Sequence, residues 1–355
     1  MLVFFLVISS LCNAGKSHGG VIKTVIILYM FSTVLAAVIA VFASMAFPVK
    51  MTLANAATDT SAPQGIVEVL NNLLLNVVAN PVSSLVNANY VGILMWAVLL
   101  GLAFRVADKM TKKVLADVAD GISMVVTWII NLAPFGIFGL VFNTVSTNGL
   151  DIFTTYGKLL ILLVGCMLFI YFVTNPLLVY WCIRQNPYPL IFQCLKRSAL
   201  TAFFTRSSAA NIPVNMKVCE EMGLDRDTYS VTIPLGATIN MDGAAITITV
   251  MTMATAFTLG IHVDIPTAII LSLLAALSAC GASGVAGGSL LLIPMACSLF
   301  GISDDISMQV VAVGFIIGVV QDSVETALNS SSDLLLSASA EFRQWRLEGK
   351  EIKFK

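Results

Sequence analysis

A long apolar segment with an aspartate near its centre places the strongest constraint on how this chain can fold. The segment covers residues 231–259, enough to cross roughly 30 Å of hydrocarbon as a helix. Asp242 would then lie inside the bilayer, where an unpaired carboxylate costs on the order of a few kcal/mol. We therefore interpret the stretch 234–243 as part of a binding site. The alternative is a glycine-kinked helix whose buried aspartate is only hydrogen-bonded.

Two polar side chains of this stretch can act together only if the helix is interrupted. Asn240 and Asp242 are two positions apart, so on an unbroken helix they point to nearly opposite faces. Gly236 and Gly243 flank the pair and lower the cost of leaving helical geometry. Unwinding frees backbone carbonyls, which suit a hard cation such as sodium.

The composition is that of an integral membrane protein. Hydrophobic residues make up 58% of the chain and charged residues 11%, and the mean hydropathy is +0.92. The 355 residues leave room for roughly eight spans. A net charge of −1 and the lack of basic runs argue against nucleic acid as a partner. The seven cysteines form no CxxC pair, and the two histidines have no ligand set beside them, so zinc is not expected.

Basic residues predict the orientation in the membrane. Nearly all of them fall in alternate connections, at Lys16, 105–113, 184–197, 217–226 and beyond Arg343. The opposite connections carry almost none apart from Lys50 and Lys158. Because basic loops stay in the cytoplasm, we expect a cytoplasmic C-terminus.

Two half-length apolar segments are interrupted by polar or glycine-rich centres. The first, 200–216, contains Arg206 and two serines, and the second, 266–300, contains the glycine-rich stretch 281–288. Each is followed by a long helix with asparagine and aspartate. This pattern is typical of an inverted-repeat secondary transporter with helical hairpins. A pair of ordinary kinked spans is the alternative, but it leaves Arg206 in the membrane unexplained.

The last predicted helix, 306–341, carries a polar stripe on one face. Its members fall at helical spacing: Asp322, Glu325, Thr326, Asn329 and Asp333. Carboxylates this close inside a membrane require cations, which sodium, Arg206 or a substrate ammonium could supply. The alternative is a solvated stripe, which the apolar run directly before Asp322 argues against.

These motifs resemble those of one transporter family. The segments Arg206-Ser-Ser, Asn240-Met-Asp-Gly243, 281–288 and 322–333 look like those of the glutamate-transporter-type dicarboxylate/amino acid:cation symporters. Within that family they are most similar to the bacterial sodium-coupled serine/threonine transporters, over about residues 1–340. The resemblance implies an all-α integral membrane protein of the bacterial inner membrane, a multi-span helical transporter with eight spans, two re-entrant helical hairpins and inverted repeats.

The resemblance also implies a homotrimer in which a mobile transport domain moves like an elevator against a fixed scaffold. The family's first helix and the front of its second have no counterpart, so we expect an N-terminally truncated member. The implied domains are a remnant of a spanning helix at 1–13, a transport-domain helix at 21–47, scaffold and trimerisation helices at 66–147, the transport domain at 150–343 and a cytoplasmic tail at 344–355. Within 150–343, hairpin 1 covers about 190–221, the unwound helix 229–259, hairpin 2 about 266–300 and the last helix 306–341.

A substrate site follows from the same resemblance. Asp322 would bind the substrate ammonium with help from Asn329, and the two serines with both hairpin tips would hold its carboxylate. Glu325 stands where members that carry acidic substrates have arginine, which favours a small neutral amino acid. Arg206 is expected to neutralise Asp322 or Glu325. The full predicted set is Arg206, Ser207, Ser208, Gly284, Asp322, Glu325, Thr326 and Asn329.

Three sodium sites are implied as well. One would use the carbonyls of Gly236, Asn240 and Asn329 with Asp333. A second would use the Thr238 carbonyl with the backbone of Ala279, Cys280 and Ala282. The third would use Tyr29, Ser32, Thr33, Asn240 and Asp242.

The predicted function is sodium-coupled import of serine or threonine, without enzymatic chemistry. The alternatives are an inactive truncated relative, an acidic amino acid or dicarboxylate symporter, a channel and a membrane enzyme. A channel would need a continuous polar pore, and an enzyme would need a nucleophile with a base or a metal set.

Overall fold

The computed structural model describes residues 20–53, 78–86, 90–131, 151–280, 282 and 287–352, together with isolated positions in between and near the N-terminus. Helices are the regular secondary structure of the described residues, with no strand among them. Most of the predicted remnant 1–13 and much of the predicted scaffold 66–147 lie outside the described residues. The elements are α2 (Gly20–Ala46), α4 (Pro81–Val86), α5 (Tyr90–Ala103), η1 (Phe104–Val106), α6 (Lys109–Asn131), α8 (Asp151–Phe169), η2 (Ile170–Thr174), α9 (Asn175–Ile183), α10 (Tyr188–Cys194), η3 (Leu195–Ala199), α11 (Leu200–Thr205), α12 (Ser208–Glu221), α13 (Arg226–Ile239), α14 (Asp242–Thr258), α15 (Ile265–Ala279), η4 (Leu290–Leu292), α16 (Ile293–Ser298) and α17 (Asp304–Leu347).

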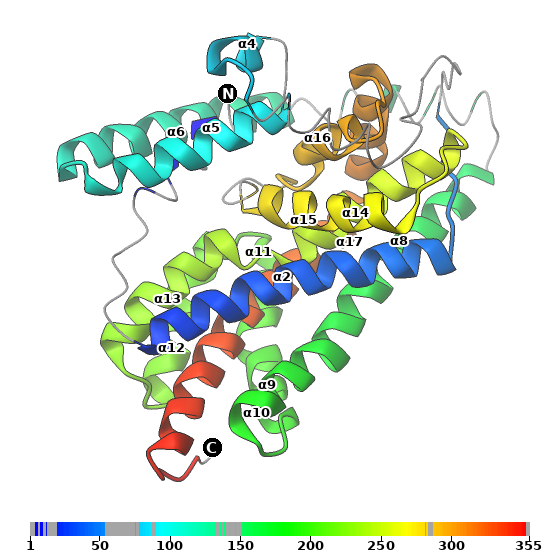
Figure 1. Cartoon of the computed structure of the whole chain (residues 1–355). Coiled ribbons are helices and arrows are strands. Elements are labelled where there is room, and N and C mark those ends of the chain that lie inside the picture. Colours follow the sequence, from blue (N-terminus) through cyan, green and yellow to red (C-terminus); the bar gives the residue numbers. More distant parts are fainter. Residues whose placement is uncertain are drawn as a thin grey trace.

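In the part of the chain that the structure describes, four segments are long and apolar enough to cross a membrane. They are Gly20–Ala46, Tyr156–Ile183, Arg226–Thr258 and Asp304–Leu347. Figure 1 shows α2 running along the body of the molecule, with α17 crossing behind it, while α5 and α6 form a separate pair at the upper left. All-helical spans are expected in hydrocarbon, because a helix satisfies its backbone hydrogen bonds internally.

Helices α14 and α17 form the centre of this body. α14 is buried at every residue from Asp242 to Ala256, and α17 contacts helices on several sides, including α2, α9, α11, α12, α13 and α14. A helix segment surrounded by other helices faces protein and not lipid. The polar residues of α14 up to Thr255, and those of α17 from Gln321 to Glu341, are therefore held inside protein.

The segment between α13 and α14 is not helical. α13 ends at Ile239 and α14 begins at Asp242, with Asn240 and Met241 in non-helical conformations between them. Helices α2 and α17 supply partners for the backbone N–H groups that this break exposes. The Met241 amide donates to Thr33 Oγ1 at 3.2 Å, and the Gly243 amide donates to Asn329 Oδ1 at 2.7 Å.

A second break separates α11 from α12. Arg206 ends α11 in the left-handed conformation, with φ of 49°. Ser207 then caps α12, since its hydroxyl accepts a hydrogen bond from the Ala210 amide at 3.2 Å. Two asparagines fix α12 to α17, because Asn211 and Asn215 both donate to Ser330. The turn therefore lies against the polar face of α17.

Some boundaries differ from the sequence expectation. α17 continues to Leu347, so the first residues of the predicted tail 344–355 are helical. One local and one tertiary contact support this extension: the Phe342 and Trp345 rings, one turn apart on α17, pack edge to face at 5.1 Å, and Arg346 Nε donates to the Cys182 carbonyl of α9 at 3.1 Å. α6 begins at Lys109, inside the basic stretch 105–113.

Candidate substrate and cation site

A small polar cavity lies where the two breaks meet α17. Its volume is about 30 Å³, room for one or two water molecules. The cavity includes seven of the eight predicted substrate residues, and the eighth, Gly284, lies outside the described residues. The complete lining is Arg206, Ser207, Ser208, Met241, Ala282, Gly288, Asp322, Glu325, Thr326 and Asn329.

Glu325 is held by three donors that the sequence reasoning did not identify. Its Oε2 accepts hydrogen bonds from Thr247 Oγ1 at 2.7 Å, Ser289 Oγ at 2.9 Å and Gln321 Nε2 at 2.5 Å. Gln321 could have been found, because it lies one helical turn before Glu325 on the same face. The other two donors come from distant segments, and no spacing pattern points to them.

Asp322 lines the same cavity but is held more loosely. Its Oδ1 accepts one hydrogen bond, from the Gly287 amide at 3.4 Å. The predicted ion pair with Arg206 is not formed: among the described residues, the ion pairs are Arg197 with Glu221 and Lys350 with Glu348. Arg206 ends a helix in the left-handed conformation, and its exposed side chain reaches the cavity wall without closing on a carboxylate.

Asp242 forms a second buried group with α2. Its Oδ2 accepts from Ser32 Oγ at 2.7 Å and its Oδ1 from Thr33 Oγ1 at 3.1 Å. Asn175 of α9 joins this group, since its Oδ1 lies 3.5 Å from Ser32 Oγ. The carboxylate is fully buried, and no lysine or arginine among the described residues pairs with it.

Asp333 forms a third buried group. Its Oδ1 accepts from Asn240 Nδ2 at 2.9 Å, whereas Asn240 Oδ1 is buried with no partner among the described residues. A Cβ added at Gly236 would lie 2.7 Å from Asp333 Oδ1. A carboxylate, an orphaned amide oxygen and a close backbone make an oxygen-rich cradle that suits a hard monovalent cation.

The structure places Tyr29 in the Asp333 group. The Tyr29 hydroxyl lies 2.9 Å from the Asp333 carbonyl oxygen and 2.8 Å from Ser337 Oγ. The family resemblance had implied that Tyr29 joins Ser32, Thr33 and Asp242. The tyrosine ring carries its hydroxyl further from the helix than serine or threonine does, so it reaches α13 and α17.

The remaining predicted sodium set is described only in part. Cys280 Sγ lies 3.8 Å from the Ile239 carbonyl oxygen, which follows Thr238 in the chain. The Ala282 amide donates to the Ala279 carbonyl at 2.9 Å. The end of α15 therefore lies beside the end of α13, where backbone carbonyls from both helices come together.

The three groups share one chemical character. The groups of Asp322 with Glu325, of Asp242 and of Asp333 each present buried carboxylate oxygens. All three lie near the helix breaks between α11 and α12 and between α13 and α14. Buried negative charge is stabilised when cations accompany it. The arrangement therefore suits the binding of cations together with a small polar molecule.

Comparisons with known proteins agree with this architecture. The model of the sodium:dicarboxylate symporter family matches residues 1–341. The serine/threonine transporter SstT from Bifidobacterium adolescentis is 59% identical over 353 residues, which is 99% of this chain and 82% of that protein. A match of this extent assigns the chain to membrane transport and not to enzymatic chemistry. This chain therefore belongs to the sodium:dicarboxylate symporter family.

Proposed function

We propose that this protein imports serine and threonine together with sodium ions across the bacterial inner membrane. One observation carries the neutral-substrate assignment: Asp322 and Glu325 line the same cavity, and Arg206 is the one basic residue among its described lining residues. The similar transporter from Bifidobacterium adolescentis is named for serine and threonine, which fits this charge balance.

Each part of a small hydroxy amino acid has a partner in the cavity. Asp322 receives the ammonium group, with Asn329 beside it. Ser207, Ser208 and Arg206 receive the carboxylate at the α11–α12 break. A second substrate carboxylate about 4 Å from Glu325 would be repelled by about 4 kcal/mol at an effective dielectric constant of 20. This repulsion disfavours glutamate and dicarboxylates.

Glu325 also explains a preference for a hydroxyl group. Every hydrogen bond that the described residues make to its carboxylate reaches Oε2. Oε1 is left to accept a hydrogen bond from the substrate hydroxyl. A site built to bond a hydroxyl discriminates against the analogue without it, because the site oxygen then loses its partner.

Sodium supplies the missing positive charge. Asp242 and Asp333 are buried and lack a basic partner among the described residues, so bound sodium ions neutralise them. The Asp333 ion takes the free Asn240 Oδ1 as a ligand. The break at Asn240 and Met241 borders the Asp242 and Asp333 groups, and Met241 also lines the substrate cavity. Sodium binding and the shape of the cavity are therefore coupled.

Transport requires the cavity to enlarge. At about 30 Å³ it holds one or two waters and no amino acid. Ser207 and Ser208 line it from the α11–α12 turn, and Ala282 and Gly288 line it from the segment after α15, so these walls separate to admit substrate. The loaded transport domain then crosses by an elevator movement within a homotrimer whose C-termini are cytoplasmic.

The test is uptake of labelled serine into proteoliposomes that contain the full chain. An inward sodium gradient should drive uptake, potassium should not replace sodium, and threonine but not glutamate should compete. Uptake without sodium, or competition by glutamate equal to that by threonine, would refute the proposal.

A variant isolates the role assigned to Glu325. Glu325→Gln should reduce the preference for serine over alanine by about tenfold, because one strong hydrogen bond to a charged acceptor is worth about 1.5–3 kcal/mol. Glu348→Gln is the matched control, since Glu348 is exposed at the end of α17. An unchanged serine-to-alanine ratio in Glu325→Gln would show that Glu325 does not contact the hydroxyl.

A further inference from the structure

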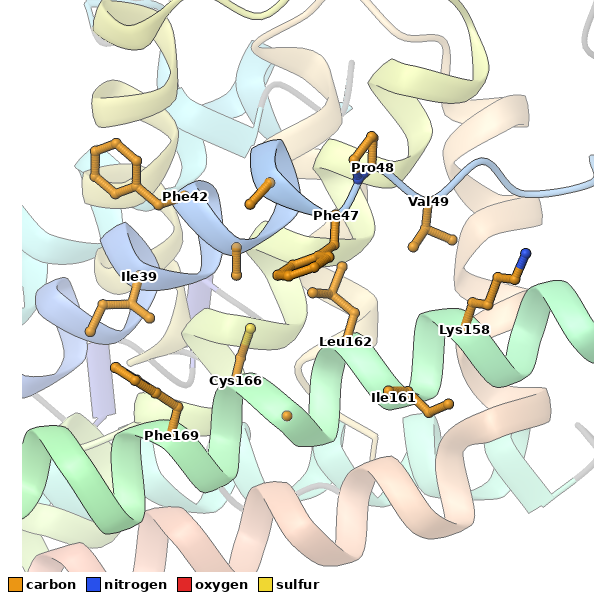
Figure 2. Close-up of a pocket in the computed structure, with 13 residues that line it drawn as sticks. Ile39, Phe42, Phe47, Pro48, Val49, Lys158, Ile161, Leu162, Cys166 and Phe169 are labelled. Atoms are coloured by element: carbon orange, nitrogen blue, oxygen red, sulfur yellow. The ribbon is translucent and has the colours of Figure 1, made fainter.

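An apolar groove of about 830 Å³ lies between α2 and α8, away from the polar site. Figure 2 shows its walls: Phe42, Ile39 and Phe169 stand at one end, and Pro48, Val49 and Lys158 at the other. Apart from Lys158, every lining residue is uncharged, and none is acidic. The groove therefore combines an apolar interior with one cationic end.

Small residues create the hollow. Ala43 and Ala46 on α2 and Gly165 on α8 line it, and a Cβ added at Gly165 would meet nothing within 4 Å. Large side chains rise on either side, with Phe42 54% exposed and Phe47 68% exposed. Side chains of this kind are exposed to lipid rather than to water in a membrane protein. The hollow is thus open toward the hydrocarbon.

The groove has the depth of one membrane leaflet. Lys158 and Phe169 are eleven positions apart on helix α8, a rise of about 16 Å. Half of a hydrocarbon core of about 30 Å is about 15 Å. Lys158 lies near the start of the candidate span Tyr156–Ile183, at the level where headgroups begin. A chain in this groove would reach from the headgroup region to the bilayer midplane.

A second lysine stands at the same end. Val49 lines the groove next to Lys158, and Lys50 follows it directly in the chain. Both lysines are exposed, and neither makes an ion pair with another described residue. These are the two basic residues that the charge pattern places on the side opposite to the C-terminus. Lys158 lines this end of the groove and Lys50 is one residue away from it, which favours a phosphate group here.

We propose that this groove binds an anionic phospholipid, with one acyl chain between α2 and α8 and its phosphate at Lys158 and Lys50. Charge complementarity selects the anionic class: Lys158 lines the groove, Lys50 lies one residue beyond the lining residue Val49, and the groove offers no carboxylate to hold the amine of a zwitterionic headgroup. The volume of the groove, its depth and its apolar lining fit an acyl chain. This site is independent of the transport assignment, because no groove residue belongs to the polar cavity.

Native mass spectrometry of the full chain in a neutral detergent tests the proposal. The protein is titrated with dioleoyl phosphatidylglycerol and separately with dioleoyl phosphatidylcholine, which share acyl chains and differ in net charge. We expect phosphatidylglycerol to bind more tightly. Lys158→Gln and Lys50→Gln should each reduce this preference about fivefold, the contribution of one lysine to binding an anionic lipid surface.

Filling the groove tests the position of the acyl chain. Gly165→Phe should weaken both lipids about tenfold, the effect of displacing two buried methylenes. Ala43→Leu is a second filling variant, and unchanged thermal unfolding shows that each protein is folded. Lys196→Gln is the control, because this exposed lysine lies on η3, far from the groove. Equal binding of the two lipids by the unmodified chain, or wild-type lipid binding in both filling variants, would overturn the proposal.

Discussion

Gly236→Ala should weaken sodium binding while leaving the substrate cavity intact. A Cβ at this position would lie 2.7 Å from Asp333 Oδ1, 2.8 Å from Asp333 Cγ and 2.9 Å from the Tyr29 hydroxyl. All three distances are far below van der Waals contact. Neither neighbour can yield easily, because Asn240 bonds the Asp333 carboxylate and Ser337 bonds the Tyr29 hydroxyl.

The magnitude follows from overpacking. Inserting a methyl group into a tightly packed buried site costs about 1–3 kcal/mol. If the displaced Asp333 carboxylate is a sodium ligand, the sodium concentration for half-maximal uptake should rise about 5- to 150-fold. Stability should change less, because alanine is favoured over glycine in a helix by up to about 1 kcal/mol. The effect therefore appears chiefly in sodium dependence.

The assay is serine uptake into proteoliposomes as a function of external sodium. Gly157→Ala is the matched control, because it makes the same change in helix α8 where an added Cβ meets nothing within 4 Å. The control should keep the wild-type sodium dependence. A Gly236→Ala protein that is folded and has wild-type sodium activation would refute the assignment of the Asp333 group as a cation site.

Three further predictions concern other contacts. Ser32→Ala removes the 2.7 Å hydrogen bond to Asp242 and should weaken sodium activation about tenfold, as a lost bond to a charged acceptor costs about 1.5–3 kcal/mol; uptake against sodium concentration measures it. Gly314→Ala should leave uptake nearly unchanged, because the nearest atom to its Cβ would be a terminal methyl of Leu290, at 2.6 Å, which can shift without moving backbone; a large loss would contradict this. Arg197→Ala breaks a half-exposed ion pair and should lower the unfolding free energy by at most about 1 kcal/mol, measured by thermal unfolding.

Much of the architecture could be predicted from the chain alone. The apolar run around Asp242 predicts a buried helix, and composition excludes a soluble fold. Ser207, and the glycines at 236 and 243 that flank residues 240–241, indicate where helices end, because these residues change local backbone energies. Local chemistry of this kind does not depend on neighbouring helices.

The partners of the polar side chains could not be predicted in the same way. Tyr29 shares a helix face with Ser32 and Thr33, yet its hydroxyl bonds to the Asp333 backbone and Ser337 while the other two bond to Asp242. Periodicity indicates the direction in which a side chain points, but not which atom of a neighbouring helix it will contact. That depends on how far each helix is shifted and rotated against the next.

The surroundings of Glu325 show the same difference between what the sequence predicts and what helix packing decides. Spacing along the last helix places Glu325 on a stripe with Asp322 and Asn329, and it shows that buried charges there need partners. Thr247 and Ser289 come from segments separated by more than thirty residues, and only the packing of α14 and the turn before η4 against α17 brings their hydroxyls to one oxygen. The sequence by itself determined which groups need partners, since that follows from the cost of burying charge. The tertiary structure decided which partners they have, because hydrogen bonds act over about 3 Å and helix spacing and rotation set distances on that scale.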